Sequence, residues 1–133
     1  MRTTGYREHF GWTVNEEENA PRLVLGHNMV ALAMARTTGG VVLDYLCRHD
    51  TRGPVLELDP GTWVFLADSN GLVLNAADLP DGVRLLGCGT AIPVPLTARH
   101  LPVRWVVAPN VRQRWLPSLA ALVAAAQTTA GSR

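Results

Sequence analysis

Residues 89–110, GTAIPVPLTARHLPVRWVVAPN, organise the chain. Two short apolar runs, residues 91–94 and 103–108, each have the length of a β-strand. Between them lies a polar loop bounded by prolines, and its hydrogen-bonding side chains include Thr97, Arg99 and His100. The pattern predicts a strand, an exposed loop that concentrates hydrogen-bonding chemistry, and a second strand.

Hydrophobic patterning on both sides of this stretch predicts helices at residues 3–11, 41–49 and 118–126. The expected strands are residues 22–25, 29–34, 55–59, 62–67 and 83–86. We expect residues 15–20 to form a charged turn, residues 22–34 to form a hairpin, and residues 37–40 to connect strand to helix. Asp59-Pro60-Gly61 predicts the tight turn of a second hairpin. The order predicts an α+β fold, with helices packed on one side of a mainly antiparallel sheet.

The length of 133 residues and the apolar content of 47% are typical of one globular domain. We expect that domain to span residues 1–127, followed by a flexible tail over residues 128–133. No apolar run approaches the ~20 residues that cross a bilayer, and the N-terminus MRTTGYREHF lacks the apolar segment of a secretory signal. Two cysteines are too few for a disulfide framework. A cytoplasmic protein without a membrane partner is the expectation.

Charge is divided unevenly along the chain, and every basic residue other than histidine is arginine. Residues 1–81 contain all eleven acids and six arginines, a net charge of −5, whereas residues 82–133 contain six arginines and no acid. A GC-rich genome explains arginine without lysine more simply than selection for forked phosphate binding does. The charge division indicates either a nucleic-acid or phosphate face or pairing between the two halves.

Several short patterns contain residues that could bind a metal, bind phosphate or react as a thiol, although none forms a complete catalytic motif. Glu57 and Asp59 lie two apart on one expected strand face, a spacing that suits a shared divalent metal, but a solvated face is favoured. Gly39 and Gly40 precede an expected helix, but the lysine of a phosphate-binding loop is missing from this segment. Cys88, between two glycines, is an exposed-thiol candidate that we expect to be inert. We therefore predict no metal, no cofactor and no catalytic residue.

Three strings carry a resemblance: HNMVALAMARTTGGVVLDYL, GPVLELDPGTWVFLAD and LPDGVRLLGCGTAIPVPLTARHLPVRWVVAP. They resemble the N-terminal domain of bifunctional DNA primase/polymerases, and are similar to short stand-alone actinobacterial relatives of that domain. The resemblance covers roughly residues 24–125. It implies a primase-polymerase-like α+β fold and a surface that binds nucleic acid or nucleotide.

The departures from that family concern its catalytic groups. Active members carry an Asp-x-Asp on a central strand that holds two metal ions, but residues 28–33 read NMVALA here. Members also carry a phosphate-contacting histidine on the following hairpin, where residues 63–66 read WVFL. The resemblance therefore implies a scaffold without polymerase activity, and Thr97, Arg104 and Trp105 match its loop Ser/Thr and its Arg-Trp pair.

Two hypotheses remain open for function. The first is a non-catalytic, regulatory primase/polymerase-like domain that binds nucleic acid or nucleotide. Its expected anion-binding and stacking residues are Thr97, Arg99, His100, Arg104, Trp105, Arg112 and Arg114. The second is a protein-interaction module or homodimer without such a ligand, because four tryptophans and several apolar strands offer a surface or a sheet edge.

Overall fold

The computed structural model describes residues 12–17, 20–26, 28–59, 61–95, 103–109 and 116–131. Within these ranges the chain forms an α+β fold whose strands pair antiparallel in two sheets, as predicted for the fold class. None of the helices in these ranges is long and apolar enough to cross a bilayer. The expected helix at residues 3–11 lies outside the described residues.

Eight strands, two α-helices and one short 3-10 helix, η1, make up the described chain. The strands are β1 (Val14–Glu17), β2 (Ala20–Val24), β3 (Met29–Ala35), β4 (Val55–Asp59), β5 (Thr62–Asp68), β6 (Arg84–Leu86), β7 (Ala91–Pro93) and β8 (Arg104–Val107). The helices are α2 (Arg36–Arg48), η1 (Ala76–Asp78) and α3 (Leu119–Gly131).

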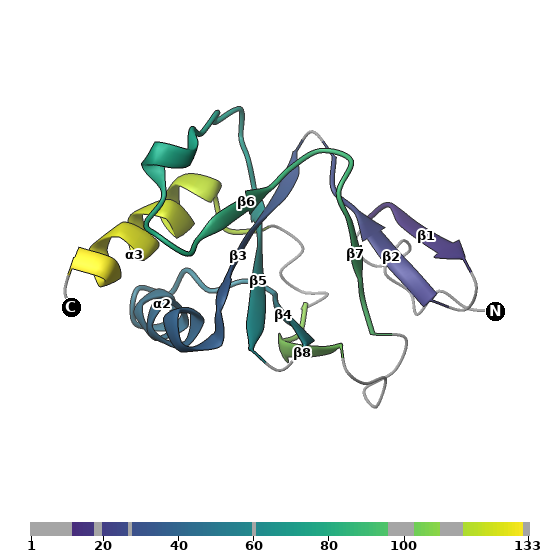
Figure 1. Ribbon diagram of the computed structural model, residues 1–133, viewed down its shortest axis with the longest axis horizontal. Coiled ribbons are helices and arrows are strands. Elements are labelled where there is room, and N and C mark those ends of the chain that lie inside the picture. Colours follow the sequence, from purple (N-terminus) through teal and green to yellow (C-terminus); the bar gives the residue numbers. More distant parts are fainter. Residues whose placement is uncertain are drawn as a thin grey trace.

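The central layer is a five-stranded sheet with the order β6-β3-β5-β4-β8. The helices α2 and α3 cover one face, and a small sheet with the order β1-β2-β7 lies on the other side (Figure 1). Burial of β3 follows from this arrangement, since both of its faces are covered. Its larger side chains, Val30, Leu32 and Met34, pack on the helix side, and Ala31 and Ala33 face the small sheet.

The two hydrophobic clusters are therefore separated by the central sheet. The cluster on the helix side includes Val42 and Leu46 from α2, Phe65 from β5, and Leu119 and Leu122 from α3. The cluster on the other side joins the sheet to the buried side chains Trp12, Val14, Leu23, Leu25, Leu56, Val64, Leu66, Ile92, Val94 and Val103. Strand alternation sends neighbouring apolar residues to opposite clusters, which explains the near-continuous apolar runs of β3 and β5.

The hairpin of β4 and β5 and the short strand β6 confirm the predictions for residues 55–67 and 83–86. Strands β7 and β8 confirm the two strands of the organising stretch, but they belong to different sheets, β7 beside β2 and β8 beside β4. The stretch between them therefore links the two sheets. Its loop lies outside the described residues.

Two predictions about the N-terminal half were wrong. Residues 14–17 form strand β1, and not a charged turn, because they pair with β2 from Val14↔Leu23 to Glu17↔Ala20. The strands β2 and β3 do not form a hairpin, since β2 pairs with β1 and β7 while β3 pairs with β5 and β6. Leu23 of β2 and Ala31 of β3 instead both belong to the hydrophobic cluster between the two sheets.

Both helices also differ from their expected bounds. The helix α2 begins at Arg36, so residues 37–40 are its first turns and not a connection. The Ser118 hydroxyl accepts a hydrogen bond from the Ala121 N–H at 3.1 Å, and α3 starts after this cap. The helix α3 continues through Gly131, and Thr129 is buried with its hydroxyl bonded to the Ala125 carbonyl at 2.9 Å. Residues 128–131 are therefore helical, where a flexible tail was expected.

The neighbouring glycines of α2 have opposite surroundings. A Cβ on Gly39 would lie 2.8 Å from Cε3 of Trp63 on β5, whereas a Cβ on Gly40 would meet nothing within 4 Å. Gly39 is buried and Gly40 is exposed. The absence of a side chain at Gly39 lets α2 rest directly on the Trp63 ring.

We expect Gly39→Ala to destabilise the fold by about 1–3 kcal/mol, because the added methyl group forces α2 away from Trp63. Gly40→Ala is the matched control, and it should stabilise by about 0.5–1 kcal/mol through helix propensity. Urea unfolding of both variants measures the difference. Equal effects of the two substitutions would contradict the close packing of Gly39 on Trp63.

Candidate ligand-binding site

The buried carboxylate of Glu57 lies at the centre of a polar contact that joins three strands of the central sheet. Strand register places Glu57 of β4 between Trp63 of β5 and Arg104 of β8. The Glu57 Oε1 atom accepts a hydrogen bond from Nε of Arg104 at 2.7 Å. The other oxygen, Oε2, accepts one from the indole Nε1–H of Trp63 at 3.2 Å. Both carboxylate oxygens therefore have donors from neighbouring strands.

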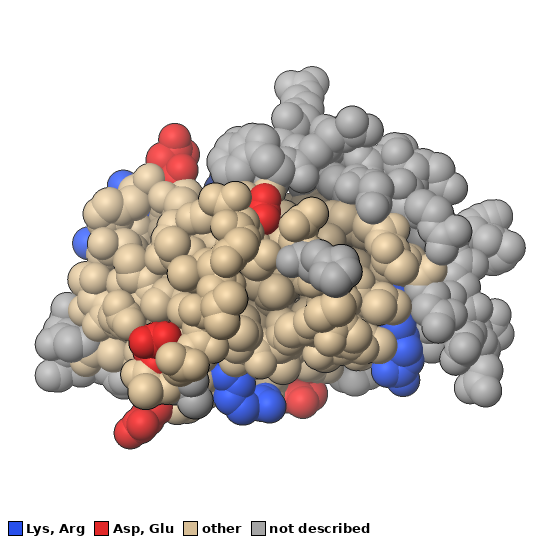
Figure 2. Space-filling view, turned by 90° about the horizontal axis from the view of Figure 1, so that it is seen from above, with Lys and Arg blue, Asp and Glu red and all other residues tan. Residues whose placement is uncertain are grey.

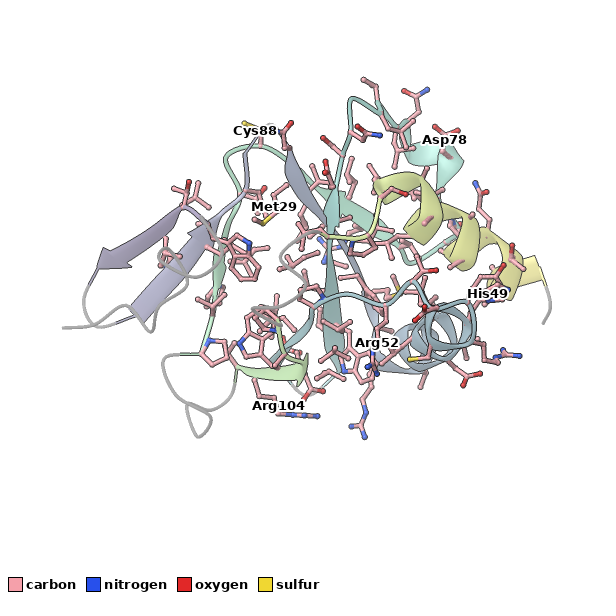
Figure 3. The ribbon with its side chains drawn as sticks, turned by 180° about the vertical axis from the view of Figure 1, so that it is seen from behind. Met29, His49, Arg52, Asp78, Cys88 and Arg104 are labelled. Atoms are coloured by element: carbon pink, nitrogen blue, oxygen red, sulfur yellow. The ribbon has the colours of Figure 1, made fainter. Side chains whose placement is uncertain are left out.

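Exposure differs sharply between the two partners of this ion pair. The Glu57 side chain is 7% exposed, and the Arg104 side chain is 46% exposed. Figure 3 shows Arg104 on β8, at the lower margin of the molecule. The arrangement is a surface guanidinium anchored at one nitrogen by a buried acid.

The charge on Glu57 is stabilised where it lies. Burial alone raises the pKa of a carboxyl, but the hydrogen bond from Trp63 and the charge and hydrogen bond of Arg104 outweigh it. Arg36, the first residue of α2, adds a further positive charge. The pKa of Glu57 consequently lies below its ordinary value, and the group is ionised at neutral pH.

The contact extends from the strands to the helix layer. Trp63 donates to Glu57 and, on the ring, contacts the backbone of α2 at Gly39. Its ring centroid also lies 6.5 Å from that of Phe65 in the hydrophobic cluster. The indole of Trp63 thus connects the polar contact around Glu57 to the apolar core, and it limits the positions that the Glu57 side chain can take.

Of the residues predicted to bind nucleic acid, two lie in the described chain. Arg104 and Trp105 occupy opposite faces of β8, as alternation predicts: Arg104 turns to Glu57, and Trp105 is half-buried. Trp105 packs against the cluster between the sheets, with its ring centroid 6.2 Å from that of Trp12. The other predicted residues lie outside the described residues, and they are Thr97, Arg99, His100, Arg112 and Arg114.

The favoured interpretation of Glu57 and Asp59 as one solvated face was wrong for Glu57. Its side chain is buried, while Asp59 is exposed. A register shift between the two residues breaks the regular pairing of β4 with β5. In the ranges that the structure describes, no three His, Cys, Asp or Glu side chains are grouped as metal ligands.

The sequence contains one signal for this site. Glu57 stands between Leu56 and Leu58 on a strand that is central to the sheet. A carboxylate there needs partners. Arg104 supplies one from 47 residues away, and strand pairing over that distance is not readable from spacing in one sequence.

A histidine and two cysteines lie away from the polar contact of Glu57. His49 ends α2, where its Nδ1 lies 2.8 Å from the Tyr45 carbonyl and its ring stacks on Tyr45 with centroids 4.1 Å apart. Cys88 and Cys47 are both exposed free thiols, and Figure 3 shows Cys88 at a turn on the opposite side of the view from Arg104. Neither thiol takes part in the polar contact around Glu57.

A pocket of about 340 Å³ lies elsewhere, at the β6 edge of the central sheet. Its lining residues are Leu74, Asn75, Leu79, Val83, Arg84 and Leu85. Figure 2 shows the upper face of the molecule, where charged side chains of the described residues are few and scattered. That face does not present the described arginines as one basic patch.

We expect Glu57→Gln to lower the free energy of unfolding by about 1–3 kcal/mol at pH 7, because a buried hydrogen-bonded charge pair is lost. Since folding lowers the pKa of Glu57, its contribution is complete above the unfolded-state value of about 4.3. It is lost as the pH falls through the lower folded-state pKa. Urea unfolding at pH 7 and near pH 3 should therefore show a difference between wild type and variant that shrinks in acid.

The matched control is Asp59→Asn, which removes an exposed carboxylate from the same strand. It should change stability by less than about 0.5 kcal/mol at either pH. A Glu57→Gln effect that stays constant between the two pH values would show that the charge of Glu57 contributes nothing.

Comparisons with protein families, with curated proteins and with solved structures found no match to this chain. The resemblance to the primase/polymerase N-terminal domain therefore stays a prediction. The α+β class and the antiparallel central sheet rest on the structure itself.

Proposed function

We propose that this chain is a non-catalytic binding protein, and that it contacts a phosphate-bearing ligand, nucleic acid or nucleotide, at the β8 edge of its central sheet. The observation that carries the proposal is the half-exposed guanidinium of Arg104, which the buried carboxylate of Glu57 anchors at Nε. A guanidinium carries five N–H donors in a fixed fork. Anchoring one of them leaves others to meet an oxyanion.

Pre-organisation is the physical advantage of this arrangement. An unrestrained arginine loses rotamer freedom when it binds, whereas one already held by a carboxylate loses less. The surrounding sequence favours an anion, since residues 82–133 contain six arginines and no acid. Phosphate is favoured over carboxylate by the resemblance, which implies a nucleic-acid or nucleotide surface around Arg104 and Trp105.

The non-catalytic part of the proposal rests on β3. In the family that the chain resembles, two aspartates of a central strand hold the metal ions of phosphoryl transfer. The strand β3 instead reads MVALAMA, and five of its seven side chains are buried in apolar clusters. A strand without metal-binding aspartates fits a regulatory role, in which the protein acts by binding its ligand.

Fluorescence anisotropy with labelled single-stranded and duplex oligonucleotides, and competition by ATP, tests this proposal at 50 and 200 mM salt. We expect affinity to fall with salt because bound counterions are released. Arg104→Gln should weaken binding about tenfold on every sequence and reduce the salt slope by about 1, as expected for one lost phosphate contact.

The matched control is Arg48→Gln, which removes an exposed arginine that pairs with Asp44 on α2. It should leave affinity within about twofold. Because Arg104→Gln also deprives buried Glu57 of its partner, the double variant Glu57→Gln/Arg104→Gln separates lost binding from lost stability. Absence of binding at 50 mM salt, or equal effects of the two single arginine variants, would refute the proposal.

A second candidate, a protein-interaction module, is favoured by an exposed apolar segment. Val73 is 86% exposed and the adjacent Leu72 is 40% exposed, both in the connection from β5 to β6. Exposed apolar side chains that are neighbours can form part of a contact surface for another protein chain.

If the chain associates with itself through this segment, sedimentation velocity should show a dimer at micromolar concentration, and Val73→Asp should shift it to monomer. Asn70→Asp, an exposed polar position in the same connection, controls for added charge alone. A wild-type monomer at all concentrations would exclude self-association as the function of Leu72 and Val73.

A further inference from the structure

A second arginine, Arg36, lies at the same end of the central sheet as Glu57. It is the first residue of α2, and its backbone N–H donates to the Gly61 carbonyl, in the turn between β4 and β5, at 2.8 Å. Just before it, the last residue of β3 pairs with the first residue of β5, Ala35 with Thr62. Figure 1 shows the junction of β3 with α2, the start of β5 and the strand β8 together at the lower margin of the view. The start of α2 therefore lies beside the polar contact around Glu57.

Arg36 also lies on the face of α2 that is turned toward the sheet. Residues three apart on a helix share a face, and Gly39, three residues further on, is the residue that rests on the Trp63 ring. The positive charge of Arg36 acts on the carboxylate of Glu57 and helps to lower its pKa. Arg104 reaches the same carboxylate from β8. Two arginines, one from α2 and one from β8, thus share one buried acid.

One carboxylate does not neutralise two guanidinium groups. Arg36 is exposed, and among the described residues it takes part in no ion pair and no side-chain hydrogen bond. The first turn of α2 contains no acid. The other acid of β4, Asp59, is exposed and forms an ion pair with neither arginine. Arg36, Arg104 and Glu57 therefore keep a net positive charge, which is complementary to an anion.

Two positive charges beside each other discriminate between kinds of phosphate. A phosphodiester inside a nucleic-acid strand carries one negative charge, whereas a terminal phosphate carries a charge of about −1.5 to −2 at pH 7 and has three strong acceptor oxygens. Arg104 still offers the N–H donors that Glu57 does not use, and Arg36 offers a second guanidinium. The doubly charged group gains more from a second cation than the singly charged one does.

We propose that Arg36 is a second phosphate-binding residue, and that Arg36 and Arg104 together hold a terminal phosphate, at the end of a nucleic-acid strand or on a nucleotide. Arg36 has this role only if the β8 edge binds phosphate as proposed above. The two arginines have different parts. Arg104 is held in place by Glu57 and fixes where the phosphate lies, and Arg36 supplies the charge that separates a terminal phosphate from an internal one.

Fluorescence anisotropy with a single-stranded oligonucleotide, labelled at its 3′ end and carrying a 5′-phosphate or a 5′-hydroxyl, tests this assignment at 50 mM salt and pH 7.5. We expect the 5′-phosphorylated strand to bind about fivefold more tightly, since hydrogen bonds to a charged group are gained. A 5′-hydroxyl strand that is one nucleotide longer has the same number of phosphates, and it should not reproduce the gain. Displacement of the strand by AMP but not by adenosine assigns the site to nucleotides as well, and displacement by neither assigns it to strand ends.

Arg36→Gln should weaken binding of the phosphorylated strand about fivefold and of the 5′-hydroxyl strand by less than about twofold. Arg36→Lys should retain part of the preference, because it keeps the charge but not the fork. The matched control is Arg48→Gln, at the other end of α2 and about 18 Å away along the helix axis, which should keep the full preference. The amide NMR spectrum of each variant reports its fold.

Equal affinity for the two kinds of strand end, or a preference that persists in folded Arg36→Gln, would overturn the role of Arg36. Binding at β8 would still stand in that case if Arg104→Gln weakens both strands. Absence of binding by either strand would refute both the β8 site and the role of Arg36.

Discussion

The buried carboxylate of Glu57 is the constraint on which the rest of the structure depends. A charge that is removed from water must be paired and hydrogen-bonded. Here the donors come from both neighbouring strands: Trp63 on β5 and Arg104 on β8. These bonds fix the register at one end of the central sheet and hold the short edge strand β8 in place. Through the contact of Trp63 with Gly39, they also set where α2 lies.

A sheet that is covered on both faces has only its edges available for binding. Helices cover one side of the five strands, the small sheet lies on the other, and the order β6-β3-β5-β4-β8 leaves β6 and β8 outermost. Each edge carries an exposed arginine, Arg84 on β6 and Arg104 on β8. The site proposed at β8 follows from this geometry, because the fixed guanidinium of Arg104 lies at one of these edges.

The sequence predicts those structural features that depend on residues close together in the chain. The hairpin of β4 and β5 follows from its alternating residues and its turn, and the opposite faces of Arg104 and Trp105 follow from strand alternation. Prediction from the sequence fails where contacts between residues far apart in the chain decide the structure. Gly39 and Gly40 look like part of a connection before a helix, but α2 begins at Arg36 and runs through both, and the missing side chain of Gly39 makes room for Trp63. Glu57 looks solvated until Arg104, 47 residues away, is placed beside it. The loop that carries most of the predicted binding residues lies outside the described chain.

The most direct test of the account is a carbon-detected NMR titration of the Glu57 side-chain carboxyl in the folded protein. We expect a midpoint below the ordinary glutamate value, and a rise of that midpoint in Arg104→Gln, because the positive charge of Arg104 and one hydrogen-bond donor are then lost. A midpoint above the ordinary value in wild type would mean that burial outweighs the partners. Trp63 and Arg104 would then not stabilise the charge of Glu57 against its burial, and the role given to this carboxylate would be contradicted.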